Sequence, residues 1–258
     1  MNNNRRVVKY ERSVLTYIDI LGFRELIETR TAGDISRSIR ILREQVRPRR
    51  FKTTIPRMTK PDFRNFSDLF VLRRAIAPKG KIPAMGEVHS QILRMVHIQS
   101  NVLLNEGILL RGGITVGDVA LSYGQLFGPA VIRGYELESQ VARFPRIVVG
   151  EEVLDELKAN QALWVHNDGQ TELRAVKSLL RRDFDGEYFV DYLRILEGEL
   201  DEPGDYPGLL ELHNEFIKQG MQRYKGRASV LPKYKWLREY HRRTVNESRK
   251  PRHITENS

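Results

Sequence analysis

The sequence has 258 residues, 40% of them hydrophobic, a size that suits one large domain or one domain with an appendage. Its formal net charge of +10 favours an anionic partner. Because it contains no cysteine, disulfides, cysteine–zinc sites and thiol nucleophiles are excluded. No apolar run approaches the roughly 18 residues of a membrane-spanning helix, and residues 1–6 lack the apolar core of a signal peptide, so we expect a soluble, cytoplasmic protein without membrane contact.

Hydrophobic periodicity predicts alternating strands and helices over residues 7–158. Runs that are uniformly apolar or rich in β-branched residues predict strands, and apolar residues at helical spacing predict helices. The expected strands are 7–20, 67–76, two runs within 108–124 that form a hairpin around Gly117-Asp118, and 146–150. The expected helices are one or two between Phe23 and Pro48, then 86–106, 129–143 and 151–159. Residues 49–66 suit either a strand or a flexible excursion, and 77–83 suit a loop.

This order, βαββαββαβ, is typical of an α+β sandwich with helices on one face of a mainly antiparallel sheet. Residues 159–248 are expected to form a C-terminal β/helical extension that packs on the 7–158 domain. Within it, β-rich segments are expected at 164–166, 173–176 and 188–193, followed by helix over 208–248 with interruptions at Gly220, Gly226 and Pro232. The tail, 249–258, is expected to be disordered.

Two aspartates lie in apolar runs of the predicted sheet. Asp19 is near the end of the first strand, and Asp68 is at the start of the next. An acidic residue in an apolar strand is costly unless a cation meets it, although each aspartate alone also suits a structural role at a turn. Two of them on neighbouring strands suggest a divalent metal held by carboxylate oxygens, which is a geometry that moves phosphate groups.

The order and spacing of these motifs resemble those of class III nucleotidyl cyclases over about residues 10–155. Asp19 precedes a Gly-Phe turn into a helix, as in the first metal motif of that family, and Ser67-Asp68 resembles the second. The further matching segments are 110–118, the helix 129–143 and the strand 145–149. The segments 111–114, 135–138 and 233–237 are most similar to those of the bacterial pyrimidine cyclases of Pycsar antiphage defence.

The resemblance implies a ferredoxin-like (palm-type) catalytic domain and a lyase reaction. The substrate would be UTP or CTP, and the products the 3′,5′-cyclic monophosphate and pyrophosphate. Two divalent ions per site, Mg²⁺ or Mn²⁺, would be held by Asp19, Asp68 and the backbone carbonyl of Ile20. Family members are head-to-tail homodimers with composite active sites, and the cyclic product would act as a second messenger on a separate effector protein in antiviral defence.

Four residues are expected to bind the nucleotide: Phe23, Arg24, Arg64 and Arg111. Phe23 and Arg24 open the helix whose amino terminus would face the phosphates, and Arg24 stands where family members usually carry Thr or Ser. Arg64 occupies the strand position that reads the base in purine cyclases. An exposed arginine in a basic stretch is the alternative interpretation of Arg64.

The predicted catalytic helix departs from the purine cyclases. Those enzymes carry an Asn and, four residues later, an Arg that contact the ribose and the transition state, whereas the matching positions here are Ile132 and Glu136. Arg133 is therefore the expected catalytic cation, with Arg111 and Arg143 as alternatives. This departure argues against purine substrates.

Two other functions remain open on the residues alone. The missing Asn and Arg favour a non-catalytic, cyclase-like domain that binds a nucleotide for signalling. The basic stretches 37–64 and 218–252 suit nucleic-acid binding, but a solvated basic face that attracts nucleoside triphosphate explains them equally, and we expect no stable nucleic-acid complex. The sequence does not separate UTP from CTP.

Overall fold

The computed structural model describes residues 7–46, 62–76, 86–164, 168–200, 202 and 204–249. The chain divides into two compact units, Met1–Asp191 and Tyr192–Ser258. The boundary expected from sequence, between residues 158 and 159, falls inside the first unit. In the described ranges, no helix combines the length and the apolar character needed to cross a membrane.

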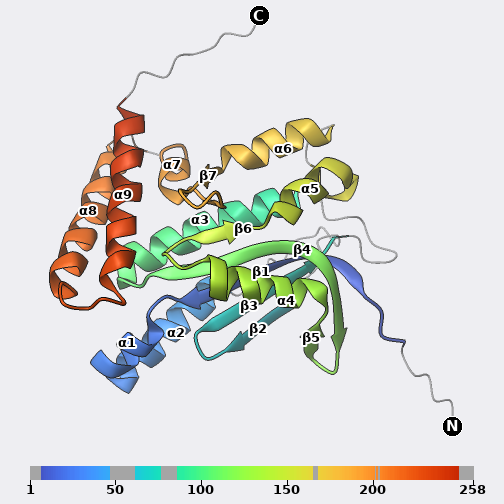
Figure 1. Ribbon diagram of the computed structural model, residues 1–258, viewed down its shortest axis with the longest axis horizontal. Helices are drawn as coiled ribbons and strands as arrows, with labels where there is room; N and C mark the ends of the chain where they lie inside the picture. The colour runs from blue at the N-terminus through green and yellow to red at the C-terminus, as the bar shows by residue number, and fades with distance from the viewer. Residues whose placement is uncertain are drawn as a thin grey trace, which may run out of the picture. The chain divides into compact units, whose positions relative to one another are not determined.

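The first unit is an α+β structure built on an eight-stranded, mostly antiparallel open sheet (Figure 1). Its strands are β1 (Glu11–Ile20), β2 (Asp62–Phe66), β3 (Leu69–Ala75), β4 (Leu110–Ser122), β5 (Gln125–Phe127), β6 (Ile147–Val149), β7 (Leu180–Arg182) and β8 (Tyr188–Val190). Its helices are α1 (Phe23–Thr29), α2 (Ala32–Val46), α3 (Glu87–Glu106), α4 (Pro129–Glu136), the π-helical turn η1 (Leu137–Val141), α5 (Glu151–Ala159), the short 3₁₀ turn η2 (Gln161–Leu163) and α6 (Gly169–Ser178). The predicted order βαββαββαβ is confirmed from β1 to β6.

The strands lie in the order β2-β3-β1-β4-β6-β8-β7, and β5 pairs with β4. β1 is antiparallel to both of its neighbours, β3 and β4, and β2 is antiparallel to β3. β6 runs parallel to β4, and β8 and β7 continue the sheet in antiparallel fashion. β1 is therefore a central strand, and β2 lies at one edge.

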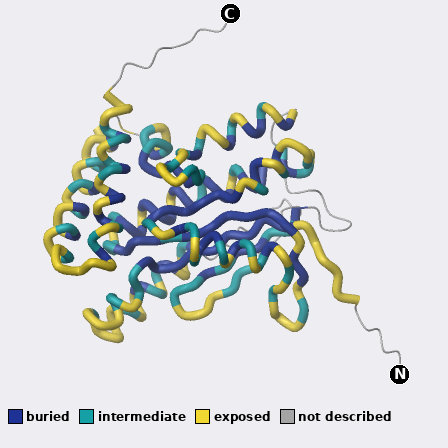
Figure 2. The backbone as a smooth tube through the Cα atoms, in the orientation of Figure 1, coloured by how far each residue is buried: buried dark blue, intermediate teal, exposed yellow. Residues whose placement is uncertain are grey.

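Both faces of β1 are covered, and the prediction of helices on one face only is wrong. Every residue from Ser13 to Ile20 is buried, as the dark central strands of Figure 2 show. Gln91 of α3 donates a hydrogen bond to the Thr16 hydroxyl at 3.0 Å, whereas the Tyr17 hydroxyl donates to the Val131 carbonyl of α4 at 3.1 Å. Because successive strand residues point to opposite faces, α3 and α4 lie on opposite sides of the sheet.

The predicted hairpin is present, but its turn is not at Gly117-Asp118. β4 runs without interruption through these residues, and the chain turns at Tyr123 and Gly124, which have φ values of 47° and 80°. A Cβ atom at Gly117 would lie 2.9 Å from the Cβ of Ala130. Gly117 therefore allows α4 to approach β4 closely, and it does not bend the chain.

The predicted strand at 173–176 is also wrong, because these residues lie in α6. Asp168 caps this helix by accepting hydrogen bonds from the backbone N–H groups of Gln170 and Thr171 at 2.9 and 2.8 Å. Leu173 and Val176, three residues apart, are both buried, which is helical spacing. Of the expected strand 164–166, residues 165 and 166 lie outside the described residues. The expected strand 188–193 is confirmed only as β8, since α7 begins at Tyr192.

The second unit is helical, as predicted for 208–248. It contains α7 (Tyr192–Leu196), α8 (Asp205–Arg223) and α9 (Leu231–Ser248). Gly220 lies within α8 and does not interrupt it; a side chain there would collide with the ring of Tyr234 on α9. Pro232 lies in the first turn of α9, where its missing N–H is tolerated. Of the tail that was expected to be disordered, 250–258 lies outside the described residues.

Candidate functional site

The candidate site lies at the carboxyl end of β1. Asp19 is the penultimate residue of β1, and its cross-strand partner is Arg111 of β4. Asp68 lies in the turn between β2 and β3, whose other residue, Ser67, has φ 53°. The Asp19 side chain is 13% exposed. It is close enough to Asp68 for the two carboxyl groups to interact by hydrogen bonding and by charge, so the structure brings the two predicted aspartates together.

Arg111 and Glu138 join the two aspartates in one cluster. The Nε of Arg111 donates a hydrogen bond to Oδ2 of Asp19 at 2.9 Å, and its Nη2 lies 2.8 Å from Oε1 of Glu138. The Glu138 side chain is 4% exposed. Its Oε1 is buried without an aligned hydrogen-bond donor, so this second contact is an ion pair held by charge alone. The cluster thus contains three carboxyl groups and one guanidinium.

Glu138 reaches the sheet through the π-helical turn η1. α4 packs along β4 and continues into η1 after Glu136. A Cβ atom at Gly113 would lie 2.5 Å from the Cβ of Leu137, so the glycine allows η1 to contact β4 beside Arg111. Single π-turns often occur at functional sites.

Glu138 was missed by sequence reasoning, although the sequence contains a signal for it. Ala130, Gly134 and Leu137 are buried on one face of α4 and η1. This is the i, i+4, i+7 spacing of a core-facing stripe, and Glu138 occupies the i+8 position of the same stripe. An acidic residue on a buried helix face requires a partner, and here that partner is Arg111.

The cluster carries more negative charge than Arg111 offsets. The pKa of Asp19 is raised from 3.8 to about 8, first by burial and then by the hydrogen bond with Asp68 and the charge of Asp68. The hydrogen bond from Arg111 lowers that pKa but is outweighed. Burial also raises the pKa of Glu138, against the opposing charge of Arg111. Asp19 therefore keeps its proton at neutral pH until a further cation approaches.

The donor atoms suit Mg²⁺ or Mn²⁺. Magnesium is commonly bound by one or two carboxylates together with water and substrate phosphates, and manganese accepts the same oxygen ligands. Within the described residues, no three His, Cys, Asp or Glu side chains are arranged to hold a metal ion, so the protein would supply only part of a coordination shell. The three carboxyl groups around the Arg111 guanidinium leave an excess of negative charge, which a divalent cation at Asp19 and Asp68 would offset.

Arg133 and Arg64 make their contacts outside this cluster. Arg133 donates to Glu152 at 3.3 Å, and Glu152 also accepts from the hydroxyl of Thr115 at 2.6 Å. Thr115 is four residues beyond Arg111 on β4, about 13 Å along the strand. Arg64 donates to the carbonyl of Gly124 in the β4–β5 turn at 2.9 Å. Neither predicted arginine is brought to Asp19 of its own chain.

The remaining predicted residues lie beside Asp19 along the chain. Ile20 ends β1 with its side chain buried. Gly22, with φ 90°, precedes α1, in which Phe23 and Arg24 are the first two residues. Arg24 is exposed, and Phe23 is partly buried. α1 therefore begins next to the acidic cluster.

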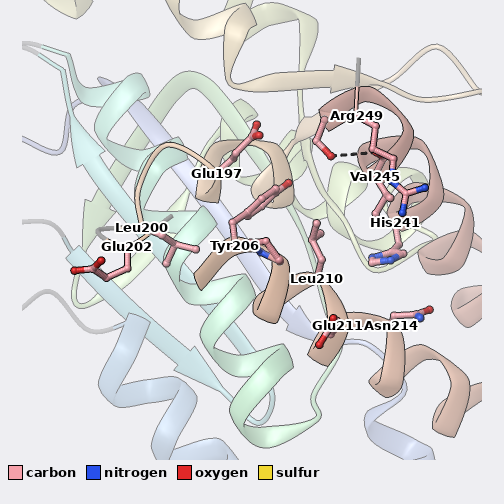
Figure 3. Close-up of a pocket in the computed structure, with 12 residues that line it drawn as sticks. Glu197, Leu200, Glu202, Tyr206, Leu210, Glu211, Asn214, His241, Val245 and Arg249 are labelled. Atoms are coloured by element: carbon pink, nitrogen blue, oxygen red, sulfur yellow. Dashed lines mark hydrogen bonds between the residues drawn. The ribbon is translucent and has the colours of Figure 1, made fainter. Parts of the chain in front are cut away.

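The second unit has a pocket of its own, with a volume of about 730 Å³ (Figure 3). Its walls include Tyr206 and Leu210 of α8 and His241 and Val245 of α9. The Nδ1 atoms of His241 and of the buried His213 are 3.1 Å apart, and Nε2 of His213 lies 2.7 Å from the Tyr192 hydroxyl. None of the residues predicted to bind a nucleotide or a metal lines this pocket.

No protein-family model matches the chain, and no curated protein matches it either. A functional assignment therefore depends on the fold and on the cluster around Asp19.

Proposed function

We propose that the protein is a metal-dependent nucleotidyl cyclase that converts UTP or CTP to the 3′,5′-cyclic monophosphate and pyrophosphate. The observation that carries this proposal is the meeting of Asp19 and Asp68 in a partly buried cluster in which three carboxyl groups surround the Arg111 guanidinium. Cyclisation is an attack of the ribose 3′-oxygen on the α-phosphate. It requires chiefly positioning and neutralisation of charge.

The strand arrangement supports a ferredoxin-like, palm-type fold for the catalytic domain. The strands β4, β1, β3 and β2 are neighbours in that order, and each is antiparallel to the next. Helices α1 and α2 connect β1 to β2, and α3 connects β3 to β4. Two interlocked βαβ units of this kind make up the ferredoxin-like motif. The order also agrees with the resemblance to class III nucleotidyl cyclases.

In this mechanism, Asp19, Asp68 and the Ile20 carbonyl would hold Mg²⁺ or Mn²⁺. Such ions, when bound, lower the pKa of the attacking hydroxyl and neutralise the triphosphate. The side chain of Asp19 is largely shielded from solvent, at 13% exposed. The exposed guanidinium of Arg24, at the start of α1, is available to the triphosphate.

The positions of Arg133 and Arg64 support a homodimer with composite sites. In a head-to-tail dimer, the metal-binding residues come from one subunit, and the transition-state and base-reading residues come from the other. Arg133 and Arg64 make their contacts away from Asp19 of their own chain, as such a division requires. Large apolar side chains are also exposed on α4 and the two hairpins, namely Phe66, Tyr123, Phe127, Ile132 and Tyr135.

The choice of a pyrimidine base and the role in antiphage defence depend on the resemblance. Ile132 and Glu136 lie on α4 where purine cyclases carry Asn and Arg. We propose that the cyclic pyrimidine nucleotide is a second messenger that acts on a separate effector protein.

The test is a product assay with each of the four nucleoside triphosphates and Mn²⁺, followed by chromatography. We expect a cyclic pyrimidine nucleotide from the wild-type protein and none from Asp19→Asn or Asp68→Asn. Asp155→Asn is the matched control, because Asp155 is 71% exposed and forms an ion pair with Lys158 of its own helix. Absence of cyclic product from every nucleotide at high enzyme concentration would refute the proposal.

A specific observation favours a second candidate, a non-catalytic nucleotide-binding domain. Arg111 is shared between two carboxyl groups, and Arg133 is paired with Glu152. If these pairs persist in the assembled protein, a triphosphate would bind without reacting. Stabilisation of the fold by UTP or CTP and Mn²⁺ without turnover would distinguish this function from catalysis.

A further inference from the structure

We propose that Arg111 stands in for the metal charge in the metal-free protein and that Glu138 is the positioning residue that holds Arg111 there. A divalent cation would bind as Arg111 releases Asp19 while remaining paired with Glu138. This inference rests on the proposed metal site at Asp19 and Asp68. It assigns Glu138 a role in metal binding without making it a metal ligand.

The contacts of Arg111 are the first support. Its Nε donates to Oδ2 of Asp19 at 2.9 Å, and its Nη2 lies 2.8 Å from Oε1 of Glu138. Nε and Nη2 lie on the same edge of the guanidinium, so one edge is divided between two carboxyl groups. The bond to Asp19 occupies an oxygen that a metal would need. Arg111 therefore competes directly with a cation for Asp19.

The surroundings of Glu138 are the second support. It is 4% exposed, on a π-helical turn whose close approach to β4 depends on Gly113. Its Oε1 has no aligned hydrogen-bond donor, so the ion pair with Arg111 is the compensation that the structure provides for this oxygen. A buried charge that loses its ion pair is strongly destabilising. Glu138 therefore retains Arg111 in the cluster when Asp19 changes partner.

The two roles predict opposite effects of two substitutions. Arg111→Gln removes the competing cation and should tighten Mn²⁺ binding, on the order of tenfold. Glu138→Gln removes the alternative partner of Arg111, so the guanidinium pairs more fully with Asp19 and Mn²⁺ binding should weaken, also on the order of tenfold. If the cluster were only structural, both substitutions would disturb Asp19 and both would weaken binding.

The experiment is Mn²⁺ binding to the full chain without nucleotide, measured from the electron paramagnetic resonance signal of free Mn²⁺. Arg111→Lys is a second variant, in case Arg111→Gln does not fold. It retains the positive charge but cannot contact both carboxyl groups through one planar edge. It should therefore tighten Mn²⁺ binding by a smaller factor, about threefold. Asp155→Asn should bind as the wild type does. Circular dichroism melting establishes that each variant is folded.

Opposite shifts for Arg111→Gln and Glu138→Gln would support the inference. Wild-type binding that depends on Asp19, together with unchanged or weaker binding by both Arg111 variants, would overturn this inference and leave the proposed function standing. Absence of Asp19-dependent binding in both the wild type and Arg111→Gln would instead remove the metal site, and with it both proposals.

Discussion

Replacing Asp19 by Asn should stabilise the metal-free protein, and the gain should grow with pH. The folded-state pKa of Asp19 is raised from 3.8 to about 8. Between these values the folded protein binds a proton that the unfolded chain has lost, so the free energy of unfolding falls as pH rises through this window. The stabilising effect of the proton is complete below 3.8 and is lost by about pH 8. Asn has no proton to lose and still offers Arg111 an acceptor oxygen.

The size of the effect follows from the pKa difference. We take about 1.4 kcal/mol per pKa unit and compare each pH with a pH below 3.8, where Asp19 is protonated in both states. The titration of Asp19 then lowers the free energy of unfolding by about 2 kcal/mol at pH 5, where only the unfolded chain has lost the proton, and by on the order of 5 kcal/mol at pH 8. The difference between wild type and Asp19→Asn should therefore change by about 3 kcal/mol over this range. A folded-state pKa one unit lower would still leave a change of more than about 2 kcal/mol.

The assay is urea denaturation of both proteins in EDTA at several pH values from 5 to 8. Subtracting the two curves removes the titration of groups that the two proteins share. The reasoning would be refuted if Asp19→Asn were destabilising to the same extent at every pH, because Asp19 would then form a net favourable ion pair with Arg111. Saturating Mn²⁺ should reduce the pH dependence of the wild type, since a bound cation favours the ionised carboxylate.

Two further predictions concern other parts of the chain. Burial, and then the charge of His241, lower the pKa of His213 to about 3. Between pH 3 and 6.5 the unfolded chain therefore binds more protons than the folded protein, so the free energy of unfolding should fall as pH drops below 6.5. In acid denaturation, His213→Gln should lose less stability over this pH range than the wild type does. Gly113→Ala should lower the free energy of unfolding by about 1–3 kcal/mol in urea titrations and weaken Mn²⁺ binding, because its methyl group would push η1 and Glu138 away from β4. Gly226→Ala, where a Cβ would meet no atom within 4 Å, is the control for Gly113→Ala, and equal behaviour of the two variants would contradict this account of Gly113.

The sequence was most informative where local pattern and tertiary packing agree. The uniformly apolar run before Asp19 predicted a central strand, and the helical spacing after Gly86 predicted α3. The acidic residues within apolar runs, Asp19 and Asp68, predicted a cluster, because a buried charge requires a partner. The strand and the helix follow from the residues of one segment each, and the cluster requires in addition only that the two strands are neighbours.

The errors arise where a residue serves a distant part of the chain. The sequence around Gly117 predicts a turn, although the small size of this residue is required by the close approach of Ala130 on α4. Leu173 and Val176 suit a strand by composition, but the Asp168 cap and the core select a helix. Glu138 could be identified only by following the buried stripe of α4 into η1, and the π-helical geometry of that turn has no signature in a single sequence.

The two aspartates of the candidate site come from parts of the sheet that differ in local stability. Asp19 belongs to a central strand with a neighbour on each side, whereas the half-buried Asp68 lies beside the edge strand β2, in a turn whose other residue, Ser67, is exposed. Opening of that turn breaks few buried contacts, so its amides should exchange with solvent far faster than those of β1. The affinity of the site for a cation therefore includes the free energy of ordering the Asp68 turn, and a ligand that orders this turn would raise the affinity without any new contact to Asp19.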